Sequence, residues 1–338
     1  MKKGNLTGIS YFIVHACVEM ICFYVLRRHY PLFVIGTVAF FYDFFAFVPQ
    51  GLIGNFIIKH KKIPFETIGH VLLLLSVFMV PFDATVIHYG GFLSMAIGNA
   101  ILHECGAIAT VADSEGKIFP AALFVSGGSF GLVIGGTLGT LGVTQWILVI
   151  PFALSVACTL YSRKSVREKS YPRFHCTNDK YTPAVILLVA FLVTTVRSYL
   201  GYAIPISWNK EVWQSFLLFF IMGFGKAIGG YFADRLGARK TAVFATLASI
   251  PFLVFGDELM VVSVIGVCLF SMTMSITFEM CLSVLPGNPG LAFGVTTAAL
   301  FFGLTPPFFF GFGLLTNAIL IVVFSLLCCF LLRKTLKE

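Results

Sequence analysis

Long apolar runs are the feature that most limits what this chain can fold into. A helix needs about 20 mostly apolar residues to cross the hydrocarbon core of a bilayer. About twelve runs of this kind follow one another with short polar interruptions. They lie near residues 8–26, 31–58, 64–82, 85–112, 118–141, 144–162, 182–205, 212–233, 240–256, 259–284, 290–311 and 313–332.

The composition agrees with a polytopic membrane protein. Hydrophobic residues make up 58% of the chain and charged residues only 11%, about half the charge content of a soluble domain. The basic N-terminus resembles the start of a signal peptide, but the apolar run after it is too long and lacks a small-residue cleavage site. We therefore expect this run to remain as the first helix.

The longest polar interruption divides the predicted helices six plus six. The predicted fold is an all-α integral membrane protein with twelve transmembrane helices in two six-helix bundles. Residues 1–162 are expected to form the N-terminal bundle, 163–181 a cytoplasmic central loop, and 182–338 the C-terminal bundle.

The distribution of basic residues predicts the orientation. Eighteen lysines and arginines, including Lys2 and Lys169, fall on one set of alternate loops, and only Arg27, Arg28 and Lys210 fall on the other set. Because cytoplasmic loops are enriched in these residues, both termini should be cytoplasmic in a multi-pass protein of the cell membrane. This placement also accounts for the net charge of +8 without a nucleic-acid partner.

The two halves contain a weak internal repeat. "QGLIGNFIIKHKK" (Gln50 to Lys62) aligns with "GGYFADRLGARKT" (Gly229 to Thr241), so that Gly51 matches Gly230 and Asn55 matches Asp234. Repeats of six helices are typical of transporters that build a central binding site between two bundles.

The second of these segments resembles the cytoplasmic loop signature of the major facilitator superfamily. The residues that carry the resemblance are Gly230, Ala233, Asp234, Arg235, Gly237, Arg239 and Lys240. Ala238 is one residue more than the pattern has, and the segment follows the eighth helix, where the family usually has its strong copy after the second. The resemblance implies two rocking six-helix bundles and secondary transport.

A carboxylate at this position can act as part of a gate. Asp234 could pair with the nearby bases or with the positive N-terminus of a neighbouring helix, while glycines let the helices approach closely. The alternative is an ordinary basic loop on the cytoplasmic side.

A glycine-rich stretch on the fifth predicted helix resembles the antiporter motif of the same superfamily. The matching residues are Gly131, Gly135 and Gly136, and Leu132 replaces the usual proline. Plain helix packing through small residues is the favoured interpretation.

Charged residues inside the apolar runs are candidates for the transport site, because charge in hydrocarbon needs a partner or a wet cavity. His15 and Glu19 are four residues apart and share one helix face, which suits proton exchange. Glu19, Asp43 and Glu104 are the candidate proton carriers, and Arg197 and Lys226 are either anion ligands or members of static ion pairs. The full set of solute- or proton-binding candidates is His15, Glu19, Asp43, His103, Glu104, Arg197, Lys226 and Glu279.

These residues also allow a metal-binding interpretation. His15, Glu19, Asp43, His103 and Glu104 offer suitable donors if their helices converge. However, the sequence has no short metal-ligand motif, and two buried bases oppose a purely cationic cargo. We therefore expect no resident metal or cofactor, and we place transport of a metal or other inorganic ion second to transport of an organic solute.

The function predicted from the sequence is proton-coupled transport of a small polar, amphipathic or zwitterionic organic solute by a monomer. No hydrolase, kinase or phosphate-loop signature is present, so we expect no enzymatic activity. The remaining alternative is an intramembrane enzyme or scaffold on a transporter fold, with His103 and Glu104 as acid and base.

Overall fold

The computed structural model describes residues 3–168 and 170–338, so Lys2 and Lys169 lie outside the described residues. Within these two ranges the backbone forms fourteen α-helices and one 3-10 helix, without a strand. The helices are α1 (Lys3–His29), α2 (Ile35–Phe47), α3 (Gln50–Lys59), α4 (Phe65–Met79), α5 (Thr85–Ala112), α6 (Phe119–Thr140), η1 (Gln145–Leu148), α7 (Val149–Val166), α8 (Pro183–Ala203), α9 (Val212–Leu236), α10 (Ala238–Val254), α11 (Met260–Ser271), α12 (Met274–Val284), α13 (Pro289–Phe309) and α14 (Leu314–Thr335).

The all-helical membrane architecture predicted from the apolar runs is confirmed. In the described part of the chain, ten helical segments are long and apolar enough to cross a bilayer. Three of these segments each consist of two consecutive helices: α2 and α3, η1 and α7, and α11 and α12. The other two predicted spans correspond to α4 and α10, with 15 and 17 residues. The count of twelve crossings therefore stays a prediction.

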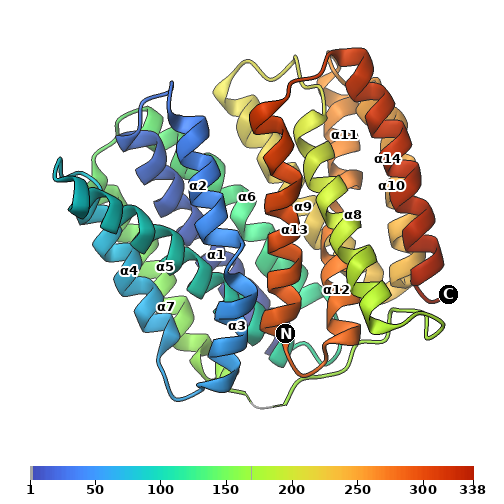
Figure 1. Ribbon diagram of the computed structural model, residues 1–338, viewed down its shortest axis with the longest axis horizontal. Helices are drawn as coiled ribbons and strands as arrows, with labels where there is room; N and C mark the ends of the chain where they lie inside the picture. Colours follow the sequence, from blue (N-terminus) through green and yellow to red (C-terminus); the bar gives the residue numbers. More distant parts are fainter. Residues whose placement is uncertain (1–2, 169) are drawn as a thin grey trace.

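Figure 1 shows the helices in two groups, α1 to α7 on one side and α8 to α14 on the other, joined by the segment between α7 and α8. The groups meet along two lines of contact. Helix α6 packs against α9, and α13 packs against α2 and α3. The two contacts place a region between the groups that helices from both halves surround.

Both termini lie at the same end of the molecule. Lys3 at the start of α1 forms an ion pair of 2.6 Å with Asp113, which directly follows α5, and Ser165 near the end of α7 also donates to Asp113. Thr177 in the central segment forms an antiparallel bridge with Leu336 near the C-terminus. An even number of crossings is required for this arrangement. We call this end of the molecule the basic end, because the predicted basic loops lie there.

The environment of Asp113 explains how an acid is accommodated at the basic end. Burial disfavours its charged form, but hydrogen bonds from Lys3, Ser165 and Thr7 outweigh this cost and hold the pKa of Asp113 below its usual value. The carboxylate of Asp113 thus connects the ends of α1, α5 and α7.

Glycines on α6 allow an unusually close contact with α1. A methyl group on Gly131 would overlap the carbonyl oxygen of Ala16 on α1. A methyl group on Gly135 would overlap the backbone of Met20, also on α1. Gly136 faces elsewhere, since the nearest atom to an added methyl group there is Cγ of Arg27 at 3.9 Å. Two of the three motif glycines therefore serve packing directly, as small residues do in membrane helix pairs.

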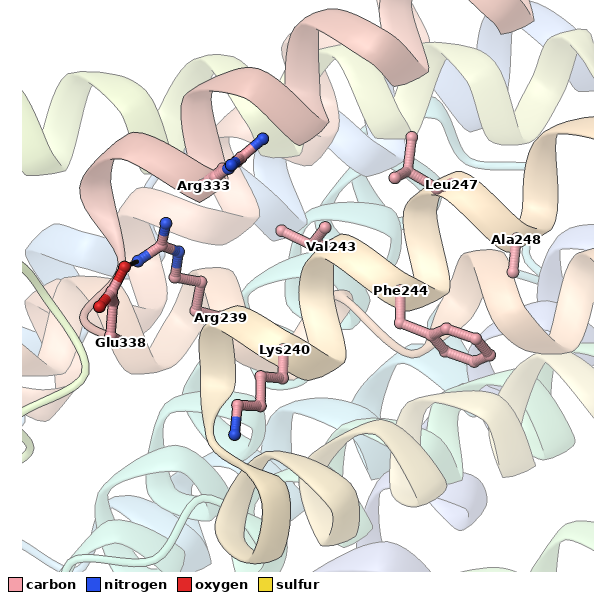
Figure 2. Close-up of a pocket in the computed structure, with 8 residues that line it drawn as sticks. All are labelled: Arg239, Lys240, Val243, Phe244, Leu247, Ala248, Arg333 and Glu338. Carbon is pink, nitrogen blue, oxygen red and sulfur yellow. Dashed lines mark hydrogen bonds and ion pairs between the residues drawn. The ribbon is translucent and has the colours of Figure 1, made fainter.

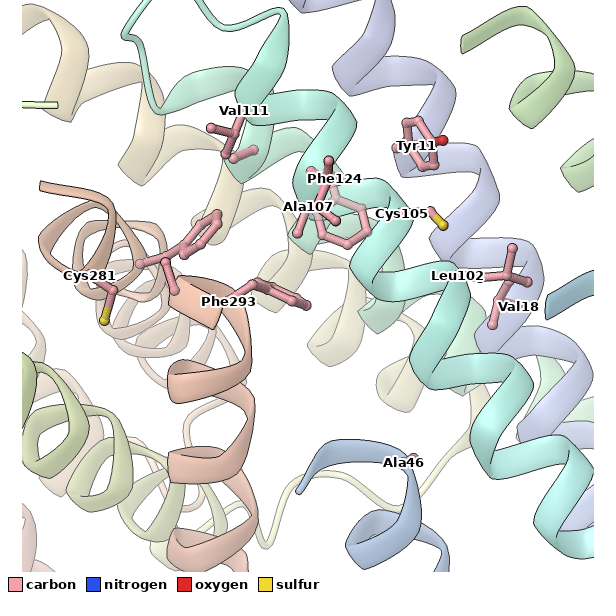
Figure 3. Packing of buried hydrophobic residues seen from close by; sticks show 14 of the residues in the cluster. Tyr11, Val18, Ala46, Leu102, Cys105, Ala107, Val111, Phe124, Cys281 and Phe293 are labelled. Carbon is pink, nitrogen blue, oxygen red and sulfur yellow. The ribbon is translucent and has the colours of Figure 1, made fainter. Parts of the chain in front are cut away.

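Buried apolar side chains connect this helix pair to the second half of the chain. Figure 3 shows Tyr11 of α1, Cys105 of α5 and Phe124 of α6 close together, with Phe293 of α13 on the other side. All four are at most 6% exposed. One apolar core therefore extends across the line between the halves.

Replacement of Gly135 by alanine should destabilise the protein, because the added methyl group forces α1 and α6 apart. Overpacking of this kind costs about 1–3 kcal/mol. The adjacent Gly136→Ala is the matched control, and it should be neutral or slightly stabilising, because alanine favours the helix. Thermal unfolding of both variants in the same detergent measures the difference. Equal melting temperatures for the two variants would contradict the packing role.

Candidate functional site

A cavity of about 240 Å³ lies between the two halves near the middle of the helices. Helices α1, α2, α5 and α6 and the first residue of α3 line it from the first half, and α9, α12 and α13 line it from the second. Of the eight predicted site residues, five line this cavity: His15, Glu19, Asp43, His103 and Lys226. Its other polar lining residues are Gln50, Ser129, Thr296 and Thr297.

Three of the titratable groups form a tight cluster. His15 and Glu19 lie one turn apart on α1, with 3.9 Å between Nε2 and Oε1, and His103 on α5 places its Nε2 3.3 Å from the same Oε1. The two imidazole rings meet edge to face, with centroids 4.2 Å apart. We call His15, Glu19 and His103 the histidine–glutamate cluster.

Hydrogen bonds hold this cluster in place from behind. Asn99, one turn before His103 on α5, donates to Oε1 of Glu19 at 2.9 Å and to the hydroxyl of Tyr42 at 2.7 Å. Nδ1 of His15 lies 2.9 Å from the carbonyl oxygen of Phe124. Asn99 was not among the site residues predicted from the sequence. Its signal was a side-chain amide in an otherwise apolar run, on the same helix face as His103.

The second half contributes one charge to the cavity. Nζ of Lys226 on α9 donates to Oγ of Ser129 on α6 at 2.9 Å. An ammonium group has three donors, so a bond to one neutral hydroxyl leaves two donors for other acceptors. Lys226 therefore places a cation opposite the carboxylates that α1 and α2 supply.

Glu104 lies outside the cavity, in the contact between the halves. Its carboxylate is packed against Gly54 of α3 and Gly290 of α13, where a methyl group on Gly54 would overlap it. Glu104 is fully buried, and neither carboxylate oxygen has a hydrogen-bond partner among the described residues. The glycines thus make room for an acid at the helix crossing.

Arg197 and Glu279 are also separate from the cavity lining. Arg197 on α8 donates to the carbonyl oxygen of Phe270 and stacks on its ring, with Cζ 4.0 Å from the ring centroid. Glu279 lies on α12 toward the basic end, and its backbone carbonyl accepts from Ser283. Arg197 is therefore held by a carbonyl and an aromatic face of its own half.

The carboxylate of Asp234 caps a helix in the opposite half. Its Oδ1 and Oδ2 accept hydrogen bonds from the backbone N–H groups of Ile118 at 2.8 Å and Phe119 at 3.0 Å, at the start of α6. Anions are stabilised at helix N-termini by the free N–H groups and the helix dipole. Gly230, one turn earlier on α9, lies so close to Ala122 that a methyl group there would overlap it.

The bases of the same motif point to other partners. Arg235 stacks on Tyr231, with Cζ 4.5 Å from the ring centroid. Arg239 pairs with Glu338 at 2.7 Å, and Figure 2 shows both beside Lys240 in a groove between α10 and α14. Gly237 has φ 92°, a conformation that glycine adopts without strain, and it forms the turn between α9 and α10. Arg235 and Arg239 thus support the C-terminal half.

The repeat-related segment in the first half makes the corresponding contact with different chemistry. Oδ1 of Asn55, which aligns with Asp234, accepts from Nδ2 of Asn288 at 2.8 Å. Asn288 in turn caps α13 by accepting from the N–H group of Leu291 at 3.0 Å. At the basic end, the end of α9 therefore contacts the start of α6, and α3 contacts the start of α13. Each contact joins the two halves.

Aromatic side chains fill the space between these contacts and the cavity. The ring of Phe293 lies 5.5 Å from that of Phe124 and 5.3 Å from that of Phe278 between centroids. Phe278 and Phe293 also line the cavity. The cavity is thus separated from the basic end by a layer of aromatic rings from both halves.

Comparisons with known proteins identify the fold. No protein-family model and no curated protein sequence matches this chain. The human organic anion transporter MFSD10 (TETRAN) matches at 15% identity and TM-score 0.64, over 98% of this chain and 100% of that one. FucP, a major facilitator superfamily transporter solved in the outward conformation, matches at 13% identity and TM-score 0.61, over 97% of both chains. Another structure of the E. coli fucose:proton symporter FucP gives 12% identity and TM-score 0.63, over 98% of this chain and 97% of that one. The predicted major facilitator fold is confirmed.

Replacement of Asp234 by asparagine should loosen the start of α6. The amide keeps one acceptor oxygen but loses the second bond and the charge, a loss of about 1 kcal/mol, or about fivefold in local opening. Hydrogen exchange of the peptide that contains Ile118 and Phe119 should therefore become faster. Asp257→Asn is the matched control, because Asp257 also accepts a backbone bond between helices, from Ser207 at 2.8 Å. Equal protection of α6 in both variants would disprove the capping role.

Proposed function

We propose that this chain, which has the major facilitator fold, is a secondary active transporter that moves a small polar solute by alternating access. The observation that carries the proposal is the cavity between the halves, in which polar and charged side chains from both face one another. Rocking of two bundles around such a site exposes it to each side of the membrane in turn.

The size and chemistry of the cavity favour a small organic solute. Its volume of about 240 Å³ lies below that of typical drug-binding pockets, about 300–1,000 Å³. Glu19 and Asp43 suit a solute ammonium group, Lys226 and Ser129 suit a carboxylate, and the aromatic rings suit an apolar part. The matched transporters are described as carrying an organic anion and fucose, and both kinds of solute are organic.

We propose that the basic end faces the cytoplasm, so that both termini are cytoplasmic. Opening on this side requires separation of the contacts made by Asp234, by Asn55 with Asn288, and by Phe293 with Phe124. Each is a hydrogen bond or an aromatic contact of moderate strength, about 1 kcal/mol in typical cases. Such contacts can hold a closed state and still break during each transport cycle.

The histidine–glutamate cluster supports proton coupling. A charged carboxylate surrounded by hydrocarbon is costly, so protonation of Glu19 depends on the charges nearby. A cationic solute group next to Glu19 favours the charged form and releases the proton. Asp43 lines the same cavity and is the second candidate carrier. Glu104 lies in the contact at the basic end, and it could exchange a proton only when that contact opens.

Glu19→Gln should uncouple transport from the proton gradient. The purified protein is reconstituted in liposomes, and uptake of radiolabelled amino acids, monosaccharides and carboxylates is measured with and without an imposed pH gradient. The native protein should accumulate one of these solutes only with the gradient, whereas Glu19→Gln should retain solute exchange and lose accumulation. Glu66→Gln is the control, because Glu66 is a buried acid on α4 that lies outside the cavity lining.

Lys226→Met should weaken binding of the transported solute by about 10–100-fold, the usual value of a hydrogen bond to a charged group. Thermal stabilisation by the same solute measures this binding without transport.

Two results would refute the proposed function. One is that no solute of the three classes crosses the membrane with the native protein. The other is that a bound solute is chemically converted and stays on its own side.

A further inference from the structure

We infer that His15, Glu19 and His103 form a binding site for one divalent transition-metal ion. The site lies in the cavity of the proposed transport function, but the inference concerns binding and does not depend on transport. A divalent metal ion would be a third ligand of this cavity, in addition to the solute and the proton of the proposed function. Four observations carry the inference: the spacing of the donor atoms, the orientation of His15, the buried nitrogen of His103 that forms no hydrogen bond with a described residue, and the charge of the cavity.

The donor atoms are spaced as ligands around one ion. Nε2 of His103 and Nε2 of His15 lie 3.3 Å and 3.9 Å from Oε1 of Glu19, and all three donors lie within 4.8 Å of one another. A zinc ion binds histidine nitrogen and carboxylate oxygen at about 2.0–2.2 Å, so tetrahedral ligands lie about 3.3–3.6 Å apart. Small side-chain movements would bring the cluster to this geometry.

The hydrogen bond of His15 leaves the correct nitrogen free. A backbone carbonyl can only accept, so Nδ1, which lies 2.9 Å from the oxygen of Phe124, must carry the proton. Nε2 then has the lone pair, and it faces Glu19. Metal-binding histidines commonly donate their other ring N–H to a carbonyl in this way. Gly128 makes room for the ring, because a methyl group there would overlap it.

His103 supplies a second, independent indication of a ligand. The residue is 3% exposed, and its Nε2 lies 3.3 Å from Oε1 of Glu19 but forms no hydrogen bond with any described residue. A buried ring nitrogen without a partner is unfavourable, and few remain so in folded proteins. A metal ion between the two histidines and Glu19 would satisfy this nitrogen.

Asn99 holds the carboxylate for the ion. It donates to Oε1 of Glu19 and to Tyr42, so the carboxylate is oriented by an amide that is itself fixed. Second-layer hydrogen bonds of this kind position metal ligands and set their basicity.

The charge of the cavity is compatible with a cation. Its lining has two carboxylates, Glu19 and Asp43, and one ammonium group, Lys226. The second base that the sequence set against a cationic ligand, Arg197, is held by Phe270 outside the lining. Two imidazoles and one carboxylate suit zinc, cobalt or nickel better than magnesium or calcium. Three protein ligands leave at least one coordination position open toward the cavity.

Cobalt binding tests the site directly, since Co²⁺ in a tetrahedral nitrogen and oxygen site absorbs strongly in the visible range. The full-length protein is purified in detergent with a tag that lacks histidine, treated with a chelator, and titrated with Co²⁺ and then Zn²⁺. We expect one Co²⁺ per chain, displaced by Zn²⁺. His103→Gln and Glu19→Gln should each weaken binding by about 100-fold or more, beyond the 10–100-fold effect of losing a second-layer contact.

His70→Gln is the matched control. His70 is also a buried histidine, but both of its ring nitrogens are engaged, Nδ1 with the carbonyl oxygen of Glu66 at 2.6 Å and Nε2 with Ser155 at 2.9 Å. It should bind Co²⁺ as the native protein does. Thermal unfolding of each variant without metal shows whether it is folded, and the result for the native protein stands without any variant.

Two outcomes would overturn the site: no stoichiometric Co²⁺ or Zn²⁺ binding by the native protein, or binding that survives in both folded ligand variants. The test separates this inference from the proposed function, because it uses detergent and no vesicles. A protein that binds Co²⁺ but moves no solute keeps the metal site and loses the transport proposal. A protein that accumulates a solute but binds no metal gives the reverse result.

Discussion

The close contact of α1 with α6 is the interaction on which the rest of the site depends. Because Gly131 brings the α6 backbone against Ala16, the side chains of the next turns have fixed positions. His15 fits over a glycine of α6 and reaches the carbonyl of Phe124, while Glu19 on the following turn reaches Asn99 of α5. A larger side chain in this contact would shift α1 and separate all of these partners. The positions of the polar side chains in the cavity therefore depend on the close packing of α1 and α6 through small residues.

Asp113 is stabilised by an ion pair with Lys3, whereas three other charges are held by groups that carry no full opposite charge. Asp234 uses two backbone N–H groups, Lys226 a hydroxyl, and Arg197 a carbonyl and an aromatic ring. A buried ion pair is hard to separate, because each partner would be left unpaired in a medium of low dielectric constant. Contacts with neutral partners cost less to exchange for water. Such contacts would suit the opening and closing between the halves that the proposed transport cycle requires.

The sequence predicted those parts of the structure that depend on local properties. Apolar runs located the helices to within a few residues, because spanning length and hydrophobicity are read from consecutive positions. The partners of the charges were not predictable in the same way. Arg239 meets Glu338 and Glu104 meets Gly290 only through packing of distant segments. Asn99 was overlooked because an amide carries no charge, although its burial cost is what requires the bonds to Glu19 and Tyr42.

The two halves share an architecture but differ in chemistry, and this difference suggests how movement and binding are linked. Among the described residues that line the cavity, the first half supplies both histidines and both acids, whereas the second half supplies Lys226 as its one charged group. In the proposed cycle the halves rock against each other, so the ammonium group changes its distance from Glu19. Electrostatic interaction in a low-dielectric site depends strongly on this distance. Rocking would therefore change the affinity of the histidine–glutamate cluster for a proton or a metal ion, even though the cluster itself stays intact within one half.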